Sequence, residues 1–417
     1  MTAATTPSIA ERLATAGLPP LPRTAWLELD LEALVANLAT IRSMAGGAAA
    51  VHPVVKADAY GHGALGIARA LETAGADGFC VAAMDEAFAL REGGIRGPIR
   101  VLYPVPPQFA DAAARAGISL SAGDLDWLAQ VIAARAWITD DGADADALLS
   151  VELEVETGLG RGGFAPEAVV TAVAYLATTP GIRLTGLWTH LQATEDEGRT
   201  AAQLARFEAV ATTLRAAGLR VPPRHVAASG GVLTGVEAYD GIRPGLSIYG
   251  ILPDELDPDD LPAEVVNRFR PVMSLHAQPV RVADLEPGHG VSYGPTFTTA
   301  RASRIATLPL GYGDGLSRSL SNRAEALVRG RRVPVVGNVA MDATMVDVTG
   351  IEPPVTTADE FVLLGSQGGE RIRAEDLARL RTTNTWEVVT SMAGRLPRVY
   401  HAASGPIGLR TLTSPGG

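Results

Sequence analysis

The chain has 417 residues, of which 47% are hydrophobic and 19% charged, and its formal net charge is −11 at pH 7. This composition is close to that of globular proteins and excludes a disordered or fibrous chain, while the length favours two domains. The charge is spread out with no basic block, so nucleic acid and an anionic membrane surface are poor partners. A small-molecule substrate is expected instead.

Residues 1–23 lack the basic start and apolar stretch of a signal peptide. No later run of about 20 apolar residues predicts a membrane span. We therefore expect a flexible N-terminal extension on a cytoplasmic protein with no membrane segment. Cys80, the single cysteine, lies in the apolar run 79–83 and is expected to be a buried, reduced thiol.

The segment from Leu31 to about Leu252 alternates short apolar runs with helix-like stretches, which indicates βα units around a parallel sheet. One such stretch, Ala64 to Ala74, is rich in Ala and Leu and ends at Gly75. Eight strands is the number of a TIM barrel, so an α/β fold with a TIM (β/α)8 barrel is predicted. The strand-like runs lie near Val51, Phe79, Arg100, Ile118, Leu148, Leu184, Arg224 and Gly241.

From Arg281 onward the pattern changes to short β-rich runs separated by Gly and Pro turns, which predicts a C-terminal β-rich domain. The acidic segment 253–264 just before it is expected to be a linker or surface loop. An isolated strand at residues 25–30 fits either domain. The predicted boundaries are 1–23 for the flexible extension, 24–265 for the barrel domain and 266–417 for the β domain, whose runs include 303–310, 333–337 and 360–364.

Lys56 is placed where the first barrel strand meets its loop, directly after His52-Pro53-Val54-Val55. Active sites of TIM barrels gather at that end of the strands. An amine at the end of an apolar strand is partly desolvated, which lowers its pKa and favours the neutral form that attacks a carbonyl carbon. Most lysines are exposed, however, so position alone does not decide between a catalytic and a surface lysine.

The run Val54-Val55-Lys56-Ala57-Asp58-Ala59-Tyr60-Gly61-His62-Gly63 resembles the cofactor-binding signature of the alanine racemase family almost letter for letter. The resemblance implies pyridoxal 5'-phosphate as cofactor and a homodimer, each subunit joining a TIM barrel to a β domain. It covers about Ala25 to Tyr400. Its further motifs, in the family's order, are Thr157-Gly158-Leu159-Gly160-Arg161, Thr189-His190, Arg243-Pro244-Gly245, Val291-Ser292-Tyr293-Gly294, Gly311-Tyr312-Gly313-Asp314-Gly315 and Met341-Asp342.

By this resemblance, Lys56 holds the cofactor and acts as one catalytic base. Tyr293, from the β domain of the partner subunit, is the other, because racemisation needs an acid/base group on each face of a planar carbanion. The ordinary pKa of tyrosine is about 10, so a positive neighbour must lower it for the side chain to serve as a base near neutrality. Dimerisation would then be a requirement for catalysis, with both active sites shared between subunits.

Arg243 corresponds to the arginine that contacts the pyridine nitrogen of the cofactor in this family. A guanidinium keeps its proton, so the ring nitrogen stays unprotonated and the cofactor is a weaker electron sink. His190 would bridge Arg243 and Tyr293 by hydrogen bonds. The other cofactor-binding residues implied are Arg161 at the phenolic oxygen and Tyr60, Ser229, Gly230, Gly231, Gly245 and Leu246 at the phosphate, while Arg161 and the partner's Tyr312, Met341 and Asp342 would bind the substrate.

Glu154 stands seven residues before Arg161, where the family often carries a lysine modified to a carbamate. Glutamate is already an anion, so we expect an unmodified residue that orients Arg161. Alternate strand residues share a face, which places Glu152, Glu154 and Glu156 together, with Leu153 and Val155 toward the helices. Mutual repulsion and burial are expected to raise their pKa values. No metal is expected at this site.

The expected reaction is the interconversion of L- and D-alanine, which supplies D-alanine for cell-wall peptidoglycan. Gly394 stands where many family members have a tyrosine and Ala340 where a cysteine is common, so serine or another small amino acid is an alternative substrate. A fold-related amino-acid decarboxylase is a further alternative, although those enzymes place an acidic residue at the pyridine nitrogen and a cysteine motif in the β domain. The last alternative is a non-catalytic pyridoxal-phosphate-binding protein that is built from the barrel alone.

Overall fold

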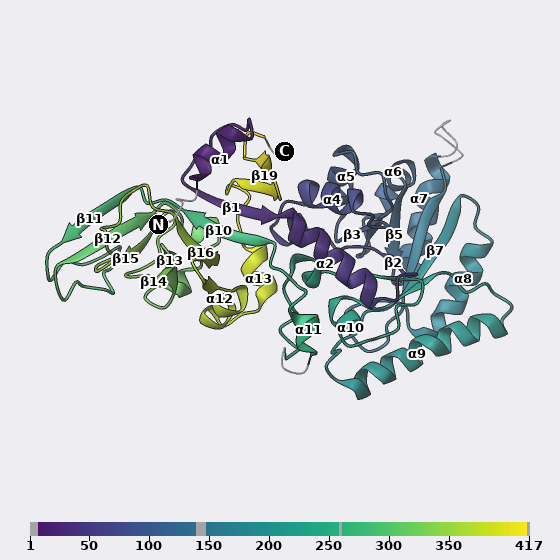
Figure 1. Ribbon diagram of the computed structural model, residues 1–417. Coiled ribbons are helices and arrows are strands. Elements are labelled where there is room, and N and C mark those ends of the chain that lie inside the picture. The colour runs from purple at the N-terminus through teal and green to yellow at the C-terminus, as the bar shows by residue number, and fades with distance from the viewer. Residues whose placement is uncertain (1–6, 139–146, 258–260, 415–417) are drawn as a thin grey trace. The chain divides into compact units, whose positions relative to one another are not determined.

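The computed structural model describes residues 7–138, 147–257 and 261–414. The chain divides into two compact units, whose elements are labelled in Figure 1. The barrel unit comprises Val35–Ala59 and Ile67–Phe269, and the β unit comprises Met1–Leu34, Tyr60–Gly66 and Arg270–Gly417. The sequence suggested a break near residue 266, whereas the β unit also takes in the N-terminal residues and the short segment that follows Lys56.

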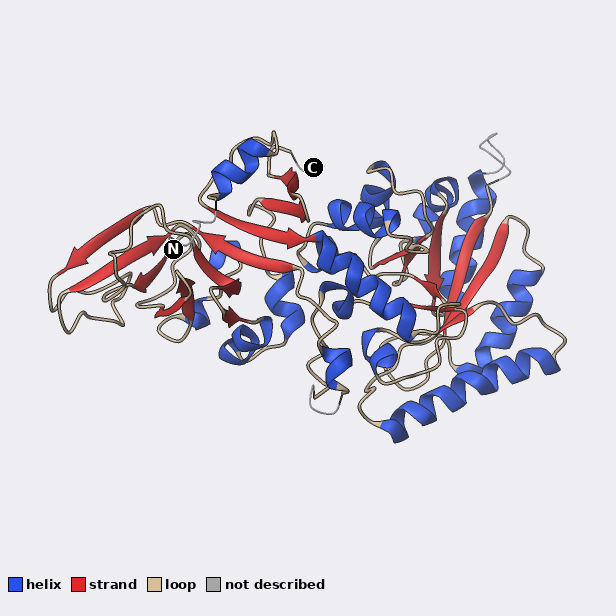
Figure 2. Ribbon diagram, in the orientation of Figure 1, coloured by secondary structure: helices blue, strands red, loops and turns tan. Residues whose placement is uncertain are grey.

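The barrel unit is built on eight parallel strands among its described residues, which carry helices on their outer side (Figure 2). A parallel bridge between Val54 and Cys80 joins the first strand to the second and closes the sheet. The predicted TIM barrel is therefore confirmed. In sheet order the strands are β2 (Ala50–Val51), β9 (Gly241–Ile242), β8 (Arg224–His225), β7 (Ile182–Trp188), β6 (Leu149–Glu154), β5 (Ile118–Ala122), β4 (Ile99–Val101) and β3 (Phe79–Val81).

The helices between these strands follow the predicted apolar pattern. Helix α4 covers Ala64–Thr73 and buries Ile67, Ala68 and Leu71, so the helix expected at residues 64–74 is confirmed. Part of the expected linker 253–264 lies outside the described residues, and helix α11 begins at its end. The other helices of this region are α2 (Leu31–Met44), α5 (Met84–Glu92), α6 (Ala110–Ala116), α7 (Leu125–Ile138), α8 (Val169–Ala177), α9 (Glu197–Ala216), α10 (Ser229–Leu233) and α11 (Ala263–Val266).

Among its described residues, the β unit contains one large sheet and a smaller three-stranded sheet. Strand β1 (Ala25–Asp30) lies between β10, to which it is antiparallel, and β18, to which it is parallel, so the isolated strand belongs to this unit. The large sheet runs β14-β13-β16-β10-β1-β18-β19 with β17 on β16, and the small one β11-β12-β15. Their bounds are β10 (Met273–Ala277), β11 (Arg281–Leu285), β12 (Ser303–Leu308), β13 (Glu325–Val328), β14 (Arg331–Pro334), β15 (Thr344–Asp347), β16 (Phe361–Gln367), β17 (Glu370–Ile372), β18 (Arg398–Ala402) and β19 (Gly405–Arg410), with helices α12 (Ala374–Arg381) and α13 (Thr385–Thr390).

Helix α1 (Ile9–Thr15) lies within residues 1–23, the segment expected from the sequence to be flexible. Ser8 and Glu11 form a capping box at its start. Ile9 and Leu13 are buried in a cluster with Trp26 of β1, together with Val399 and Leu409. The apolar pair four residues apart and the capping signature are both visible in the sequence, and they explain why this part of the extension is folded.

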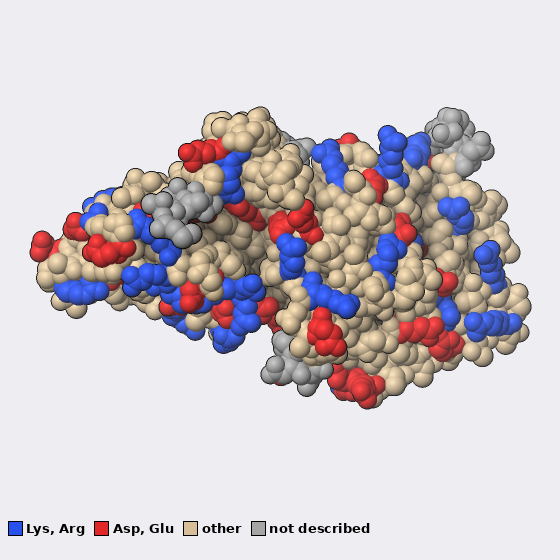
Figure 3. Space-filling view, in the orientation of Figure 1, with Lys and Arg blue, Asp and Glu red and all other residues tan. Residues whose placement is uncertain are grey.

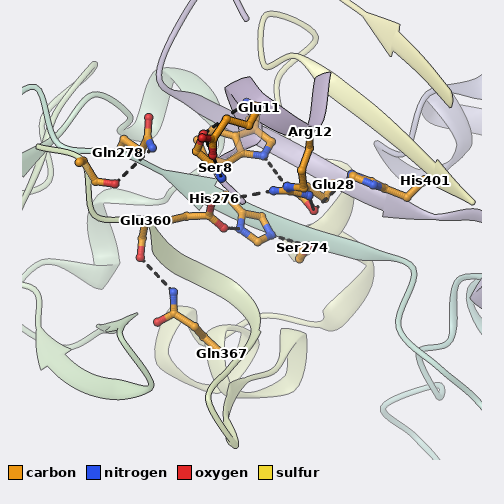
Figure 4. Close-up of polar contacts among 12 residues, drawn as sticks. Ser8, Glu11, Arg12, Glu28, Ser274, His276, Gln278, Glu360, Gln367 and His401 are labelled. Atoms are coloured by element: carbon orange, nitrogen blue, oxygen red, sulfur yellow. Dashed lines mark hydrogen bonds and ion pairs between the residues drawn. The ribbon is translucent and has the colours of Figure 1, made fainter. Parts of the chain in front are cut away.

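Glu28 of β1 ties helix α1 to the large sheet (Figure 4). Its Oε1 accepts a 2.6 Å hydrogen bond from Arg12, and its Oε2 lies 3.2 Å from Nε2 of His401. Burial alone would raise the pKa of Glu28, but these contacts hold it well below its ordinary value. Glu28 also lies near His276 and Glu360. One carboxylate oxygen or ring nitrogen from each of the three side chains lies within 4.8 Å of the other two, which is the spacing of a metal site. The guanidinium of Arg12 already supplies the positive charge at this cluster.

Acidic and basic side chains are interspersed on the face of the molecule seen in Figure 3, as the even spread of charge in the sequence predicts. Within the described residues, none of the helices has the length and apolar run that a bilayer crossing requires. Cys80 is a free and buried thiol, as expected, and burial raises its pKa to about 11.

Candidate active site

Lys56 follows β2 at the carboxyl end of the barrel, and the backbone after it has an unusual conformation. Ala57, Asp58, Ala59 and Tyr60 have φ values of 51°, 56°, 55° and 52°, so four consecutive residues other than glycine are left-handed. Burial lowers the pKa of Lys56, the positive charge of Arg161 lowers it further, and Glu86 opposes both. The pKa of Lys56 is thus lowered in the direction expected from the sequence.

Arg243, at the end of β9, is held rigidly in the barrel interior. Its Nη1 donates to Nδ1 of His225 at 2.5 Å and its Nη2 to the carbonyl oxygen of Thr189 at 2.8 Å. The guanidinium also lies over the ring of Trp188, 4.8 Å from the ring centre. Burial lowers the pKa of Arg243 to about 10, so the side chain remains a cation near neutrality.

His225 connects Arg243 to a buried ion pair. Because Arg243 donates to Nδ1, this nitrogen is the acceptor, and Nε2 carries the proton that is donated to Glu152 at 2.9 Å. Burial lowers the pKa of His225 to about 4 although Glu152 opposes the shift, so the ring is neutral. Glu152 in turn accepts a 2.6 Å hydrogen bond from Arg100. Neither His225 nor Arg100 was predicted from the sequence as a site residue, although a histidine at the end of a predicted barrel strand is a signal that points to His225.

The expected bridge from His190 to Arg243 and to the partner's Tyr293 stays a prediction. Within the described residues, hydrogen bonds from Nη1 and Nη2 of Arg243 go to His225 and to backbone carbonyl groups. The barrel register brings the adjacent strand β8 and its histidine against the guanidinium. Burial, together with the positive charges of Arg243 and Arg161, lowers the pKa of His190 to about 3 and keeps it neutral.

Glu154 pairs with Arg161, as the sequence analysis expects, at 3.4 Å between Oε1 and Nη2. The guanidinium of Arg161 also lies over the ring of Tyr103, 5.2 Å from its centre. Burial raises the pKa of Glu154 although Arg161 opposes the shift. The carboxylate and the aromatic face hold this arginine from two directions.

The three glutamates do not form one set of repelling carboxylates. The raised pKa expected for Glu152 is wrong: burial alone would raise it, but Arg100 and His225 hold it well below its ordinary value. Glu156 lies beyond the end of β6, and its carboxylate accepts hydrogen bonds from the backbone N–H groups of Gly158 and Gly160. It therefore shapes the turn that leads to Arg161.

Ser229 and the residues after β9 form two helix starts that are tied together. The hydroxyl oxygen of Ser229 accepts hydrogen bonds from the N–H of Gly245 at 3.0 Å, the N–H of Ser247 at 3.2 Å and the hydroxyl of Ser247 at 2.9 Å. A Cβ at Gly230 would lie 2.3 Å from the Thr194 hydroxyl, so a side chain there would require Thr194 to move. Helix α10 and the 3-10 helix Leu246–Tyr249 thus start beside one another, and first-turn N–H groups are suited to an anion.

The β unit holds the remaining expected residues on exposed loops. The side chains of Tyr293, Tyr312 and Met341 are 78%, 44% and 54% exposed. The N–H groups of Tyr312 and Gly313 donate to the carbonyl groups of residues 340 and 341, which fixes the two loops side by side. Asp342 pairs with Arg395 at 2.6 Å. Tyr60 is buried and is also grouped with this unit, one residue beyond the barrel segment that carries Lys56.

A closed parallel barrel with a partly buried lysine after its first strand, paired helix starts after its last two and a separate β unit defines a TIM-barrel enzyme with a candidate reactive amine. The chain belongs to the alanine racemase family, and it is an isomerase of the racemase type. The family model for the alanine racemase N-terminal domain matches residues 29–253, and that for the C-terminal domain matches residues 272–400.

Similar proteins agree with this assignment. The alanine racemase of Symbiobacterium thermophilum is 41% identical over 381 residues, covering 91% of this chain and 97% of that protein. The alanine racemase of Bacillus anthracis with bound L-Ala-P has a TM-score of 0.85 at 30% identity, covering 95% and 99% of the two chains. A histidine racemase of Leuconostoc mesenteroides has a TM-score of 0.82 at 28% identity, covering 92% and 99%.

Proposed function

We propose that this protein is a pyridoxal-phosphate-dependent racemase that interconverts L- and D-alanine by a two-base mechanism. The observation that carries the proposal is the site at Lys56, where a desolvated amine lies at the end of the first strand of a barrel whose chain belongs to the alanine racemase family. Membership of that family also argues against the decarboxylase and the non-catalytic binding protein as alternatives.

The residues present fit pyridoxal 5'-phosphate. An aldehyde needs an amine, which Lys56 offers, and a phosphate needs N–H donors, which the paired helix starts at Ser229 and Leu246 offer. The hydroxyl hydrogen of Ser229 is used in none of the three bonds that its oxygen accepts, so it can donate to the phosphate. Arg243 presents a fixed cation for the ring nitrogen.

When bound, the cofactor delocalises the negative charge that removal of the α-proton leaves on the substrate. Lys56 removes or returns this proton on one face, and its lowered pKa favours that role. Arg161, held by Glu154 and Tyr103, orients the oxygen-bearing groups of cofactor and substrate. Arg243 donates a hydrogen bond without releasing its proton, because neutral His225 accepts from it and Glu152 fixes that ring.

The second base in this proposal is Tyr293 of a second copy of the chain. Its phenol is highly exposed in the single chain, as a group that acts in another subunit must be. Tyr312, Met341 and Asp342 are exposed near one another in the same unit and are proposed to contact the substrate. The active enzyme is therefore proposed to be a homodimer.

Alanine is the preferred substrate, because the similar proteins with assigned names are mostly alanine racemases. Serine or another small amino acid is the alternative, since a Cβ added at Gly394 would meet nothing within 4 Å. The proposed role of the product is the supply of D-alanine for peptidoglycan. We also propose that the enzyme works in the cytoplasm, where the buried thiol of Cys80 stays reduced.

An absorbance spectrum followed by product analysis tests the proposal. The purified protein should show a band near the visible edge that borohydride abolishes, and it should form D-alanine from L-alanine. A Lys56→Ala variant, the control, should lack both. A wild-type protein with neither the band nor D-amino-acid formation across a panel of L-amino acids would contradict the proposed function.

A further inference from the structure

Glu86, in the first turn of α5, bonds to the backbone at two different strand ends. Its Oε1 accepts a 2.6 Å hydrogen bond from the N–H of Ala57, the residue after Lys56. Its Oε2 accepts from the N–H groups of Ala82 and Ala83, after β3, at 2.8 and 3.1 Å. One carboxylate therefore joins the turn that follows β2 to the turn that follows β3.

This contact lies where the barrel closes. The bridge between Val54 and Cys80 joins the first strand to the second. Glu86 bonds to the residues that follow the same two strands in the chain. A side chain that accepts from both strand ends fixes their offset at the level of the reactive amine. Backbone N–H groups are obligatory donors, so each of these bonds is costly to lose without a replacement.

The turn that Glu86 holds is one that the chain does not adopt on its own. Ala57, Asp58 and Ala59 are all left-handed, and such a conformation costs about 1 to 2 kcal/mol for each residue with a Cβ. Strained backbone at a functional site persists only where the surrounding structure fixes it. The bond to Ala57 N–H fixes the first left-handed residue, where the chain turns away from Lys56.

Glu86 also affects the amine through its charge. Burial and the positive charge of Arg161 both lower the pKa of Lys56, and the negative charge of Glu86 acts in the opposite direction. The same carboxylate thus has two effects on one lysine, and a substitution can separate them.

We infer that Glu86 is a positioning residue for Lys56, which clamps the left-handed turn after β2 so that the amine leaves the barrel strand in its working direction. The expected effect on catalysis rests on the proposed function. The clamp itself is a set of backbone contacts that needs no cofactor. Glu86→Gln keeps the size of the side chain but puts an amide NH2 group against at least one N–H donor. Glu86→Asp keeps the charge but is one methylene too short to reach both strand ends.

Two measurements test the inference, one for the charge of Glu86 and one for the clamp. The first is competitive acetylation of Lys56 with acetic anhydride in the full-length apoprotein, read by mass spectrometry as a function of pH. In Glu86→Gln the midpoint should move to lower pH by about half a unit or more, because a negative charge is lost. The second is racemase turnover, where kcat should fall about tenfold or more with a small change in KM, as expected for a misplaced reacting group.

The control is Glu92→Gln, the same substitution at an exposed position of the same helix, which should change neither measurement. Glu86→Asp should keep the acetylation midpoint but lose turnover. A Glu86→Gln protein that matches Glu92→Gln in both measurements would overturn the inference. Should Glu86→Gln not fold, wild-type turnover in Glu86→Asp would overturn it equally. Wild-type protein without racemase activity would refute the proposed function, while the acetylation midpoint, which needs no cofactor, would still show whether the charge of Glu86 acts on Lys56.

Discussion

Arg243 and His225 are joined by a 2.5 Å hydrogen bond from Nη1 to Nδ1 inside the barrel. The bond fixes the histidine tautomer, because Nδ1 must accept and Nε2 must then donate to Glu152. The cation proposed to face the cofactor is thus held by a neutral ring and not by a carboxylate directly.

The first prediction concerns this bond. His225→Ala removes one hydrogen-bond partner from Arg243 and one from Glu152, although Arg243 keeps its backbone carbonyl acceptors and Glu152 keeps Arg100, at a cost of about 1 to 3 kcal/mol. We expect a lower melting temperature and a weaker pyridoxal-phosphate dissociation constant, measured by absorbance titration. His52→Ala is the control, since His52 is also a buried histidine of the barrel but makes no hydrogen bond to Arg243. Equal losses of cofactor affinity in the two variants would show that the hydrogen bonds from Arg243 to His225 and from His225 to Glu152 have no specific role in cofactor binding.

Much of the fold could be predicted because strand periodicity, helix length and glycine stops are local properties. All eight barrel strands lie at the predicted runs, for example β7 at the run near Leu184. Hydrogen-bond partners that come from different barrel strands could not be predicted in this way. Arg243 meets the Thr189 carbonyl 54 residues away and His225 18 residues away, and such pairs depend on strand register, which sequence spacing does not determine. The same holds for the pairing of Glu152 with Arg100.

The two proposed bases should have different effects when removed. Lys56→Ala should abolish racemisation from both enantiomers, whereas Tyr293→Phe should slow α-proton exchange mainly from one enantiomer, by about 10² to 10⁴. Solvent deuterium incorporation from L- and D-alanine measures this. Tyr175→Phe, a change at another exposed tyrosine, is the control and should leave both rates unchanged. Equal deuterium incorporation from both enantiomers in Tyr293→Phe would refute the two-base assignment.

Glu154→Gln should weaken the site at Arg161. The contact of 3.4 Å is between an anion and a cation, and loss of the charge costs about 1 to 3 kcal/mol. We expect lower turnover and cofactor affinity, and no dependence of wild-type activity on bicarbonate, because residue 154 needs no carbamate. Glu167→Gln is a matched control on the barrel surface. Unchanged kinetics in Glu154→Gln would show that Glu154 only fills space in the barrel interior. Activation of the wild-type enzyme by bicarbonate would contradict the prediction that residue 154 is unmodified.

The ion pair of Arg12 and Glu28 should make the docking of helix α1 sensitive to acid. The pKa of Glu28 is lowered in the folded protein, so its stabilising effect is complete above its ordinary pKa of 4.5 and is lost as the pH falls through the window below that value. Glu28→Gln should therefore destabilise the protein at pH 7, by about 1 to 3 kcal/mol. The difference from wild type should shrink below pH 4.5, by about 1.4 kcal/mol per pH unit.

Thermal unfolding of the two proteins between pH 7 and pH 3.5 measures this difference. Glu286→Gln, at an exposed position of the same unit, should differ little from wild type throughout. A stability difference between wild type and Glu28→Gln that stays constant down to pH 3.5 would contradict the lowered pKa of Glu28.

The last prediction concerns the size of the substrate side chain. Gly394 lies between Ala393, whose N–H bonds to the Asp314 carbonyl, and Arg395, which pairs with Asp342. Position 394 is therefore held beside a residue proposed to contact the substrate. An added Cβ meets nothing within 4 Å, and the backbone there is not left-handed, so a side chain can start from this position without a clash at Cβ.

Gly394→Tyr should reduce serine turnover relative to alanine turnover, because the hydroxymethyl group of serine is larger than a methyl group and the added ring fills open space. A difference of one small group in a pocket is worth about 1 to 3 kcal/mol, or roughly 10- to 200-fold in kcat/KM. Gly394→Ala leaves the space open and should keep the wild-type ratio. The measurement is kcat/KM for L-alanine and L-serine in the three proteins. A wild-type enzyme that does not turn over serine, or a ratio that Gly394→Tyr leaves unchanged, would mean that the substrate limit is set by other residues, because the open space at Gly394 would then lie outside the substrate's reach.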